Sequence, residues 1–234
     1  MRIMTKINLG LGIKKRVLDS PTANALRTII NPGRLKLPSY NLFLRPDYAC
    51  KVTVPWLPTK EEDTNYNDLV ALLFISLRIA PARILEVGTC RGRTTVALAE
   101  NHPGVPLISY DIALQAGEYI KDSPFASAID IRVKDFALDE ARLLREPPFD
   151  LVFIDASHDY DSVMAHSLLS LRIVSQRGVI LWHDYGNVGG FSGALAVPEV
   201  LAKLTKDYRI QGIKGTTLAA YFAPECILGS TQHT

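Results

Sequence analysis

The sequence predicts one α/β domain with a doubly wound, mainly parallel sheet, preceded by an N-terminal arm. Three observations favour this fold: β-rich runs alternate with stretches of helical length, one run is apolar throughout its middle, and glycines follow the first run. With 234 residues and 47% hydrophobic content, the chain can bury a sizeable core. This composition excludes a disordered chain and a fibre.

Residues 1–63 lack a sustained hydrophobic period and contain six prolines, so we expect an accessory arm of short segments, with the domain spanning 64–234. The arm is basic: the first 50 residues carry nine Lys or Arg against two Asp or Glu, whereas the rest carries 17 against 22. Because these charges are spread out, they disfavour binding to nucleic acid or a membrane, and because the rest of the chain is net acidic, we expect the arm to pack against a second subunit, as a dimer. Attraction of an anionic acceptor is the alternative.

Cysteine usage and hydropathy indicate a soluble protein of a reducing compartment, the cytoplasm. The three cysteines are scattered and form neither a disulfide framework nor a CxxC pair. The longest apolar run, from Leu69 to Leu77, is far shorter than the ~20 residues of a membrane span. We expect no signal peptide, because glycines interrupt the apolar stretch at 7–13 and no small-residue cleavage site follows it.

The first regular element is an amphipathic helix around Leu69–Leu77, which Pro81 ends. Stretches of helical length then separate five β-rich runs, as expected of parallel βαβ units; the runs are 83–87, 107–110, 131–133, 151–154 and 179–182. The run within 150–155 is apolar rather than alternating, which predicts a central strand buried on both faces.

The C-terminal part of the domain is expected to differ. A helix containing Val197, Val200, Leu201 and Leu204 precedes two further β-rich runs, 208–213 and 218–222. Four residues join these runs, too few for a parallel crossover, so the two strands should pair antiparallel. The predicted sheet therefore has seven strands.

Two glycines follow the first strand, in Glu86-Val-Gly88-Thr-Cys90-Arg-Gly92. Open α/β sheets bind ligands at the carboxyl ends of their strands, and glycine lets the backbone approach a ligand. Cys90 stands where a dinucleotide fingerprint has its second glycine, and no Gly-Lys-Ser/Thr follows, so neither that fingerprint nor a P-loop is present. The loop predicts a nucleotide pocket of another kind.

The pattern Glu86-x-Gly88-x-x-x-Gly92 resembles the first motif of class I methyltransferases that use S-adenosylmethionine (SAM), and the resemblance extends over about 64–222. It implies a Rossmann-like, seven-stranded sheet with an antiparallel final strand. It also implies that Asp111 holds the ribose hydroxyls and that Asp135 and Phe136 flank the adenine. The implied cofactor-binding residues are Glu86, Gly88, Thr89, Cys90, Gly92, Thr94, Asp111, Ile112, Asp135, Phe136 and Asp155. Taken singly, each glycine or carboxylate also fits a turn or a helix cap.

Acidic and imidazole side chains follow the fourth and fifth strands. Asp155 and His158 come after the fourth strand, and His183 and Asp184 after the fifth. Since consecutive strands usually lie side by side, ~4.8 Å apart, the two groups should converge. The pattern resembles macrocin-type small-molecule O-methyltransferases, relatives of the catechol and caffeoyl-coenzyme A enzymes, which hold a divalent metal at these strand ends.

This resemblance implies a metal site formed by Asp155, His183 and Asp184. Carboxylate oxygens are ligands that Mg²⁺ prefers. Catechol-type relatives have an oxygen ligand at the position of His183; an imidazole suits Mn²⁺, Fe²⁺ or Zn²⁺ better, or does not ligate. We expect Mg²⁺ or Mn²⁺.

His158 stands where catechol-type relatives carry their lysine base. An imidazole, with an ordinary pKa near ~6.5, can accept the acceptor's proton at neutral pH, so His158 and Asp155 are the catalytic candidates. Alternatively, His158 ligates the metal, orients Asp155 or caps the next helix. His102 and His166 are expected at the surface.

The sequence therefore predicts a SAM-dependent O-methyltransferase that acts on a small-molecule hydroxyl, sugar or phenolic, of a secondary metabolite with the help of a divalent metal. A bound cation would lower the pKa of the hydroxyl. The alternatives are a metal-free enzyme with His158 as base, a nicotinamide-dependent oxidoreductase and a non-catalytic binding module. The loop 186–196 and aromatic residues of the arm are candidates for the acceptor pocket; the latter are Tyr40, Phe43, Tyr48 and Trp56.

Overall fold

The computed structural model describes residues 37, 39–40, 52–55, 57, 64–185 and 196–229. The chain divides into two compact units, 1–35 and 36–234, of which the first lies outside the described residues. The side chains proposed to line an acceptor pocket from the arm also lie outside them, as does most of the loop 186–196. In the part of the chain that is described, no helix is long and apolar enough to cross a membrane.

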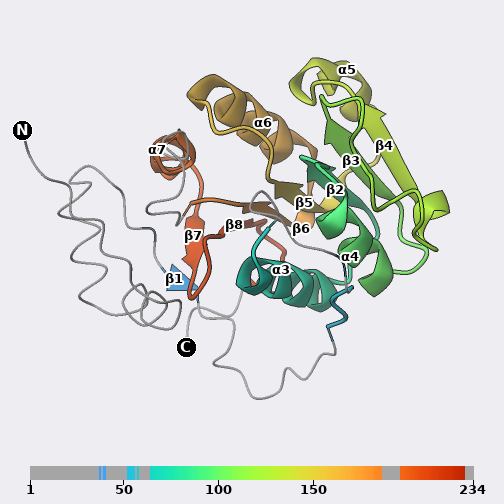
Figure 1. Ribbon diagram of the computed structural model, residues 1–234. Coiled ribbons are helices and arrows are strands. Elements are labelled where there is room, and N and C mark those ends of the chain that lie inside the picture. The colour runs from blue at the N-terminus through green and yellow to red at the C-terminus, as the bar shows by residue number, and fades with distance from the viewer. Residues whose placement is uncertain are drawn as a thin grey trace, which may run out of the picture. The chain divides into compact units, whose positions relative to one another are not determined.

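A single twisted sheet organises the described residues, with strand order β1-β7-β8-β6-β5-β2-β3-β4 (Figure 1). The strands are β1 (Ser39–Tyr40), β2 (Ile84–Val87), β3 (Leu107–Asp111), β4 (Ile129–Val133), β5 (Phe149–Ile154), β6 (Val174–Trp182), β7 (Ile210–Ile213) and β8 (Ala219–Phe222). All pairs are parallel except those of β8, which runs antiparallel to β6 and β7. The seven predicted strands and the reversed final strand are confirmed, and the two-residue β1 adds an unpredicted edge.

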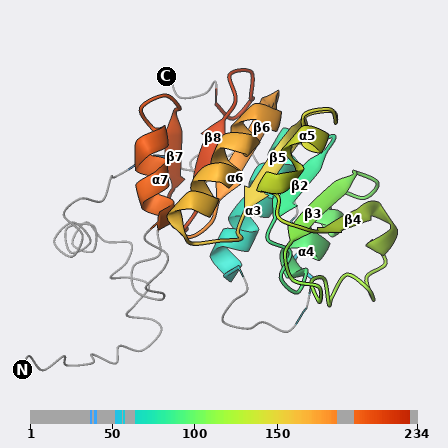
Figure 2. The same ribbon diagram turned by 90° about the horizontal axis from the view of Figure 1, so that it is seen from above.

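Helices cover both faces of the sheet (Figures 1 and 2). They are α3 (Tyr66–Ile79), α4 (Arg93–Asn101), α5 (Glu140–Leu143), α6 (Tyr160–Ile173) and α7 (Ala196–Leu204). Helices α5, α6 and α7 pack on one face and α3 and α4 on the other, each face with its own apolar cluster. Helix α3 begins after Asn65, whose side chain accepts a hydrogen bond from the Asp68 amide, and it ends just before Pro81, as predicted.

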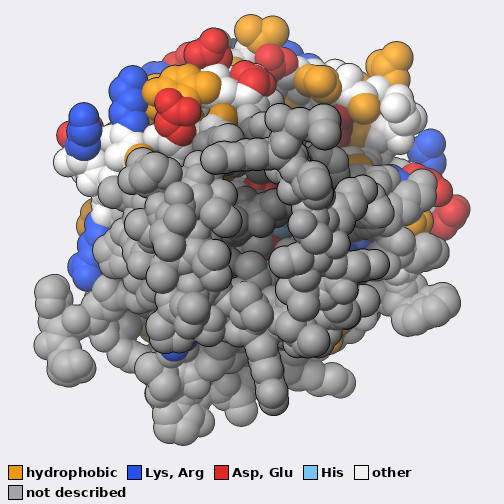
Figure 3. Space-filling view, turned by 60° about the vertical axis from the view of Figure 1, so that its left-hand side comes forward, with side chains coloured by type: hydrophobic (Ala, Val, Ile, Leu, Met, Phe, Trp, Pro, Cys, Tyr) orange, Lys and Arg blue, Asp and Glu red, His pale blue; other side chains and the backbone are white. Residues whose placement is uncertain are grey.

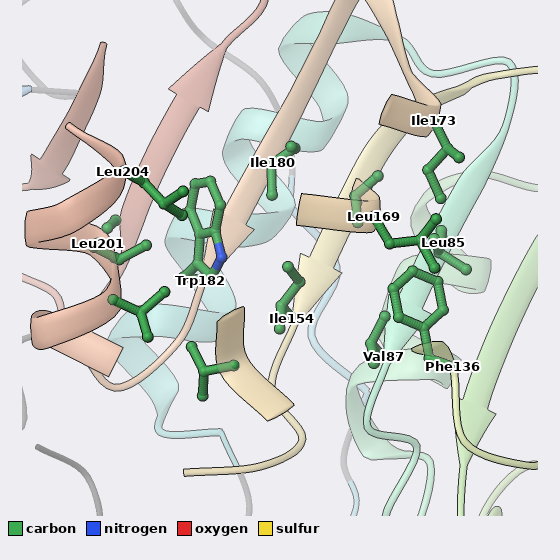
Figure 4. Packing of buried hydrophobic residues seen from close by; sticks show 14 of the residues in the cluster. Leu85, Val87, Phe136, Ile154, Leu169, Ile173, Ile180, Trp182, Leu201 and Leu204 are labelled. Carbon is green, nitrogen blue, oxygen red and sulfur yellow. The ribbon is translucent and has the colours of Figure 1, made fainter. Parts of the chain in front are cut away.

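The core on the α6 and α7 face anchors the strands that lead to the candidate site. Trp182, the last residue of β6, is fully buried and lies beside Leu201 and Leu204 of α7 (Figure 4). Its indole Nε1 donates a hydrogen bond of 2.9 Å to Ser167 Oγ of α6, so the buried N–H is satisfied. This packing fixes the point at which β6 ends.

The described surface visible in Figure 3 carries basic, acidic and hydrophobic side chains interspersed with one another. Within the described ranges, several large apolar side chains are also exposed near the carboxyl ends of β3 and β4, among them Ile112, Leu114 and Leu138. Both features are normal for a protein surface.

Candidate active site

The carboxyl ends of four neighbouring parallel strands bring the predicted site residues to one edge of the sheet. The order β6-β5-β2-β3 places the glycine loop after β2 between Asp111, which ends β3, and the acidic residue Asp155, which follows β5. His183 and Asp184 follow β6 on the other side of β5. The predicted convergence of these segments is therefore present in the structure.

The glycine loop is held tightly against its neighbours. Gly88 has φ of 107°, and a Cβ built on it would lie only 2.1 Å from the carbonyl oxygen of Asp155. Gly92, with φ of 87°, is the N-cap of α4, and Cys90 adopts a φ of 46° between the two glycines. Positive φ favours glycine, and the close approach at Gly88 excludes any side chain there.

Asp111 connects this loop to β3. Its Oδ2 accepts a hydrogen bond of 2.7 Å from the Cys90 amide, and its Oδ1 accepts one of 2.8 Å from the Ala113 amide. The residue is half-buried, and each carboxylate oxygen can accept more than one hydrogen bond. The carboxylate is thus fixed in place with capacity left for two hydroxyl donors. Ile112, which follows it, is 79% exposed.

Glu86 lies beneath the loop and is fully buried. Its Oε2 accepts hydrogen bonds from Ser109 Oγ, at 2.6 Å, and Thr95 Oγ1, whereas Oε1 has no partner among the described residues. Ser109 Oγ also lies 2.6 Å from Thr89 Oγ1. Burial raises the pKa of Glu86 to about 8, so it keeps its proton at neutral pH. A buried carboxyl oxygen without a partner is uncommon, and it marks Glu86 as a candidate contact for a ligand.

Asp135 and Phe136, predicted to flank the adenine, differ in exposure. Asp135 Oδ1 accepts a hydrogen bond of 2.9 Å from the Ala137 amide and lies 3.7 Å from His166 Nε2. Phe136 is only 2% exposed and makes edge contacts with the rings of Tyr110 and His166. Its ring therefore belongs to the hydrophobic core.

Two histidines expected at the surface are buried, so that prediction is wrong. His166 is 7% exposed and packs under Phe136, while His102 is 8% exposed with Nε2 2.8 Å from Ser76 Oγ of α3. Burial lowers the pKa of both side chains, which favours the neutral imidazole. A neutral ring fills an apolar gap and still satisfies a polar neighbour.

The predicted metal ligands Asp155, His183 and Asp184 form one cluster, with a ligand atom from each within 4.8 Å of the others. His183 Nδ1 lies 2.9 Å from Asp155 Oδ1 and 3.4 Å from Asp184 Oδ2. Asp184 has φ of 58°, uncommon for a residue with a side chain. This backbone turn directly follows β6 and carries the Asp184 carboxylate to His158, whose Nε2 lies 2.6 Å from Asp184 Oδ2.

The charges in this cluster are strongly coupled. Burial disfavours a charged His183, but the carboxylates of Asp155, Asp184 and Asp68 outweigh it and raise the pKa of His183 well above its ordinary value. The hydrogen bond to Asp184 raises the pKa of His158. Although burial acts against it, the two imidazoles hold the pKa of Asp184 well below its usual range. A charged His183 therefore supplies positive charge beside the carboxylates.

A small cavity opens beside the cluster. Its lining includes Asp155 and His158 from the β5–α6 connection, His183 after β6, and the apolar side chains of Val163 and Val197. The side chain of His158 is 38% exposed, the most accessible of the site's ionisable groups on this side. The cavity is thus lined on one side by two of the predicted metal ligands and His158, and on the other by apolar side chains.

Sequence reasoning missed two residues at the start of α3. Thr64 Oγ1 donates a hydrogen bond of 3.0 Å to Asp155 Oδ2 and lies 3.0 Å from Thr94 Oγ1, a predicted cofactor residue. Asp68 is fully buried, and its Oδ2 lies 3.0 Å from His183 Nε2. The available signal for Asp68 was its position four residues before Leu72, which places an acidic side chain on the apolar face of the helix.

Comparison with known proteins gives three kinds of result. Residues 85–185 match a family model described as a methyltransferase domain. No curated protein matches the chain. Similar solved structures include the O-methyltransferase from Bacillus cereus in complex with S-adenosylhomocysteine (SAH). It is 19% identical, with a TM-score of 0.55 over 70% of this chain and 84% of that one.

Two further solved structures extend this likeness. The O-methyltransferase TomG from Streptomyces achromogenes, involved in tomaymycin synthesis and in complex with SAM, is 19% identical with a TM-score of 0.54 over 70% of this chain and 82% of that one. The SAH-bound methyltransferase PaMTH1 from Podospora anserina is 16% identical with a TM-score of 0.59 over 94% and 99%. At these identities the likeness shows a common fold.

Proposed function

We propose that this chain transfers a methyl group from SAM to a hydroxyl oxygen of a small molecule, assisted by a divalent metal, because residues 85–185 match a family model described as a methyltransferase domain and the fold resembles that of solved O-methyltransferases. One observation carries the proposal: the cluster of Asp155, His158, His183 and Asp184 lies next to the glycine loop. A sugar or phenolic hydroxyl is the proposed acceptor.

The residues around the glycine loop fit SAM. The ribose of SAM presents two hydroxyl donors, which the fixed carboxylate of Asp111 has the capacity to accept. The amino acid part of SAM presents an ammonium group, which beside Glu86 would favour loss of the carboxyl proton and so leave Oε1, which has no partner among the described residues, free to accept a hydrogen bond. A nicotinamide dinucleotide fits less well, because Cys90 replaces the second glycine of its fingerprint.

The cluster also fits a divalent metal. It offers two carboxylates and one imidazole, and His183 Nδ1 faces both carboxylates while making no hydrogen bond within the described residues. This donor set suits Mn²⁺, and Mg²⁺ with water completing its shell. A bound divalent cation lowers the pKa of a coordinated hydroxyl and stabilises the alkoxide or phenoxide.

His158 is the proposed general base. It lines the cavity, its side chain is partly exposed, and its Nε2 is held by Asp184 Oδ2. An imidazole in this place accepts the proton of the acceptor, and the Asp184 carboxylate stabilises the imidazolium that forms. Asp155 orients the other side of the cluster through its contacts with His183 and Thr64.

A metal-free methyl transfer with His158 alone as base is the second candidate. The observation that favours it is the direct pairing of His183 with Asp155 and Asp184, because an imidazolium there neutralises the carboxylates without a metal. The two candidates differ in one measurable property, which is the response of the reaction to chelation.

Calorimetric titration with SAM and with S-adenosylhomocysteine tests the cofactor assignment. We expect both ligands to bind, and Asp111→Ala to weaken binding at least tenfold, because it removes the acceptor for two hydroxyls. Asp161→Ala, an exposed carboxylate of α6, serves as the matched control. Absence of binding heat from either ligand would refute the cofactor assignment.

Methyl transfer to a panel of catechols and sugars, followed as SAH release, tests the chemistry. Exhaustive chelation should abolish the reaction and added Mg²⁺ or Mn²⁺ should restore it, while Asp184→Asn should lower it even with metal present. Activity that survives chelation would contradict metal assistance and favour the second candidate.

We also propose that the basic arm mediates a dimer and that the protein acts in the cytoplasm. The charge contrast between the first 50 residues and the rest of the chain supports the dimer. Deleting residues 1–45 and measuring mass by light scattering tests it; a dimer that persists without the arm would contradict this role.

A further inference from the structure

Asp68 is a fully buried carboxylate that neither the cofactor assignment nor the metal ligand set includes. Four donors surround it within the described residues. Its Oδ1 accepts a hydrogen bond of 2.8 Å from the Thr217 amide. Its Oδ2 accepts hydrogen bonds from Thr217 Oγ1 and from Asn65 Nδ2, and lies 3.0 Å from His183 Nε2.

These hydrogen bonds determine the protonation of His183 Nε2, the ring nitrogen that faces Asp68. Because the Thr217 amide, the Thr217 hydroxyl and the Asn65 amide all donate to it, Asp68 acts as an acceptor only. His183 Nε2 must therefore be the N–H that donates to Oδ2. The opposite nitrogen, Nδ1, then points at Asp155 and Asp184.

Two further contacts, one on the His183 ring and one just before α3, support this orientation of His183 and Asp155. The ring of Phe153 packs edge-on against His183, with centroids 6.3 Å apart. Thr64, four residues before Asp68, donates to Asp155 Oδ2. The first turn of α3 and the residues just before it thus contact two of the three proposed ligands from outside the strand ends.

We propose that Asp68 is a positioning residue, which holds His183 in the tautomer and orientation that present Nδ1 to a divalent cation together with Asp155 and Asp184. The proposal rests on the metal-assisted function proposed above. A carboxylate that accepts the second N–H of a ligating imidazole orients the ring and selects its tautomer.

Substitution by asparagine tests this arrangement because the amide cannot satisfy every neighbour. If its NH₂ group faces Thr217, it opposes the backbone N–H, which cannot reverse. If the NH₂ group faces His183, then Nε2 must accept and the ring proton moves to Nδ1, which can no longer bind a metal. The metal site suffers in either orientation, through the position of the ring or through its tautomer.

The experiment compares Zn²⁺ binding to the wild-type protein, Asp68→Asn and Ser76→Ala by calorimetry, with Zn²⁺ as the probe because it accepts imidazole ligands. Ser76 is a buried polar residue near the other end of α3, bonded to His102, and its loss perturbs the same helix without touching the site. We expect Asp68→Asn to weaken Zn²⁺ binding about 10- to 100-fold and Ser76→Ala to leave it unchanged. SAM affinity should be retained in both variants, which shows that the fold is intact.

Nitrogen-15 NMR of the histidine rings in the Zn²⁺-loaded wild-type protein gives a second readout that needs no variant. We expect a metal-shifted Nδ1 and a protonated Nε2 for His183. Equal Zn²⁺ affinity in Asp68→Asn and the wild-type protein, or a proton on Nδ1 of the loaded protein, overturns the role of Asp68. A wild-type protein that binds neither Zn²⁺ nor SAM overturns the proposed function itself.

Discussion

Replacing Gly88 by alanine tests how closely the glycine loop approaches the neighbouring strand. A Cβ at this position would lie 2.1 Å from the carbonyl oxygen of Asp155 and 2.6 Å from its carbonyl carbon. Both are backbone atoms, so no side-chain rotation relieves the contact. The two segments must separate by about 0.9 Å to reach 3.0 Å, the shortest distance that real Cβ contacts show.

Two costs add in Gly88→Ala. A φ of 107° costs an alanine about 1–2 kcal/mol, and the forced displacement adds about 1–3 kcal/mol, as for other overpacked sites. The expected loss is therefore about 2–5 kcal/mol, a large part of the roughly 5–15 kcal/mol that stabilises a typical domain. Because the displaced carbonyl belongs to Asp155, SAM and metal binding should weaken as well.

Gly104→Ala is the matched control, because Gly104 has φ of 81° and a Cβ there meets nothing within 4 Å. It should lose only the conformational cost, about 1–2 kcal/mol. Urea denaturation gives the free energy of unfolding of both variants, and calorimetry gives their SAM affinity. Equal losses of stability in the two variants would refute the steric argument.

Two further substitutions probe buried polar groups. Burial raises the pKa of Glu86 to about 8 from its ordinary value of 4.5, so the folded protein holds more protons than the unfolded chain in that interval, and its stability should fall as pH rises, by about 1.4 kcal/mol per pH unit. Glu86→Gln should lack this loss in urea denaturation across the same interval; an identical pH dependence in both proteins would contradict the protonated Glu86. Tyr110→Phe removes a hydroxyl that donates 2.7 Å to Asp139 Oδ2 and accepts 2.7 Å from Arg132 Nη1, so it should lower the free energy of unfolding by about 1–3 kcal/mol. A loss under about 0.5 kcal/mol, the size of an ordinary surface substitution, would contradict this expectation, because it would show that water replaces the lost hydrogen bonds of Asp139 and Arg132.

Local pattern was enough to predict the strands and the glycine loop. The apolar middle of β5 indicated a central strand, and it does lie between β2 and β6. The short link between the last two β-rich runs indicated the antiparallel pair β7 and β8. Because parallel strands end at a common edge, strand order also placed Asp155 next to His183 and Asp184.

Contacts between distant segments could not be predicted in the same way. Asp68 and His183 are 115 residues apart, and His102, the C-cap of α4, pairs with Ser76 of α3. A hydrophobic period shows which face of a helix is buried, but it does not show what that face meets. The two-residue β1 is too short to produce a period, so its pairing with β7 also escaped prediction.

The hydrogen bonds between Asp68 and Thr217 span 149 residues and bear on the order in which the molecule is completed during synthesis. By residue 184 a growing chain has produced all three proposed ligands, but the hairpin of β7 and β8, whose turn leads to Thr217, is still missing. Until that hairpin pairs with β6, Asp68 lacks two of its donors and β6 remains an open edge. The first turn of α3 is synthesised early but acquires its hydrogen bonds to Thr217 late, so a nascent chain should not hold the proposed metal firmly until the β7–β8 hairpin has been translated and has paired.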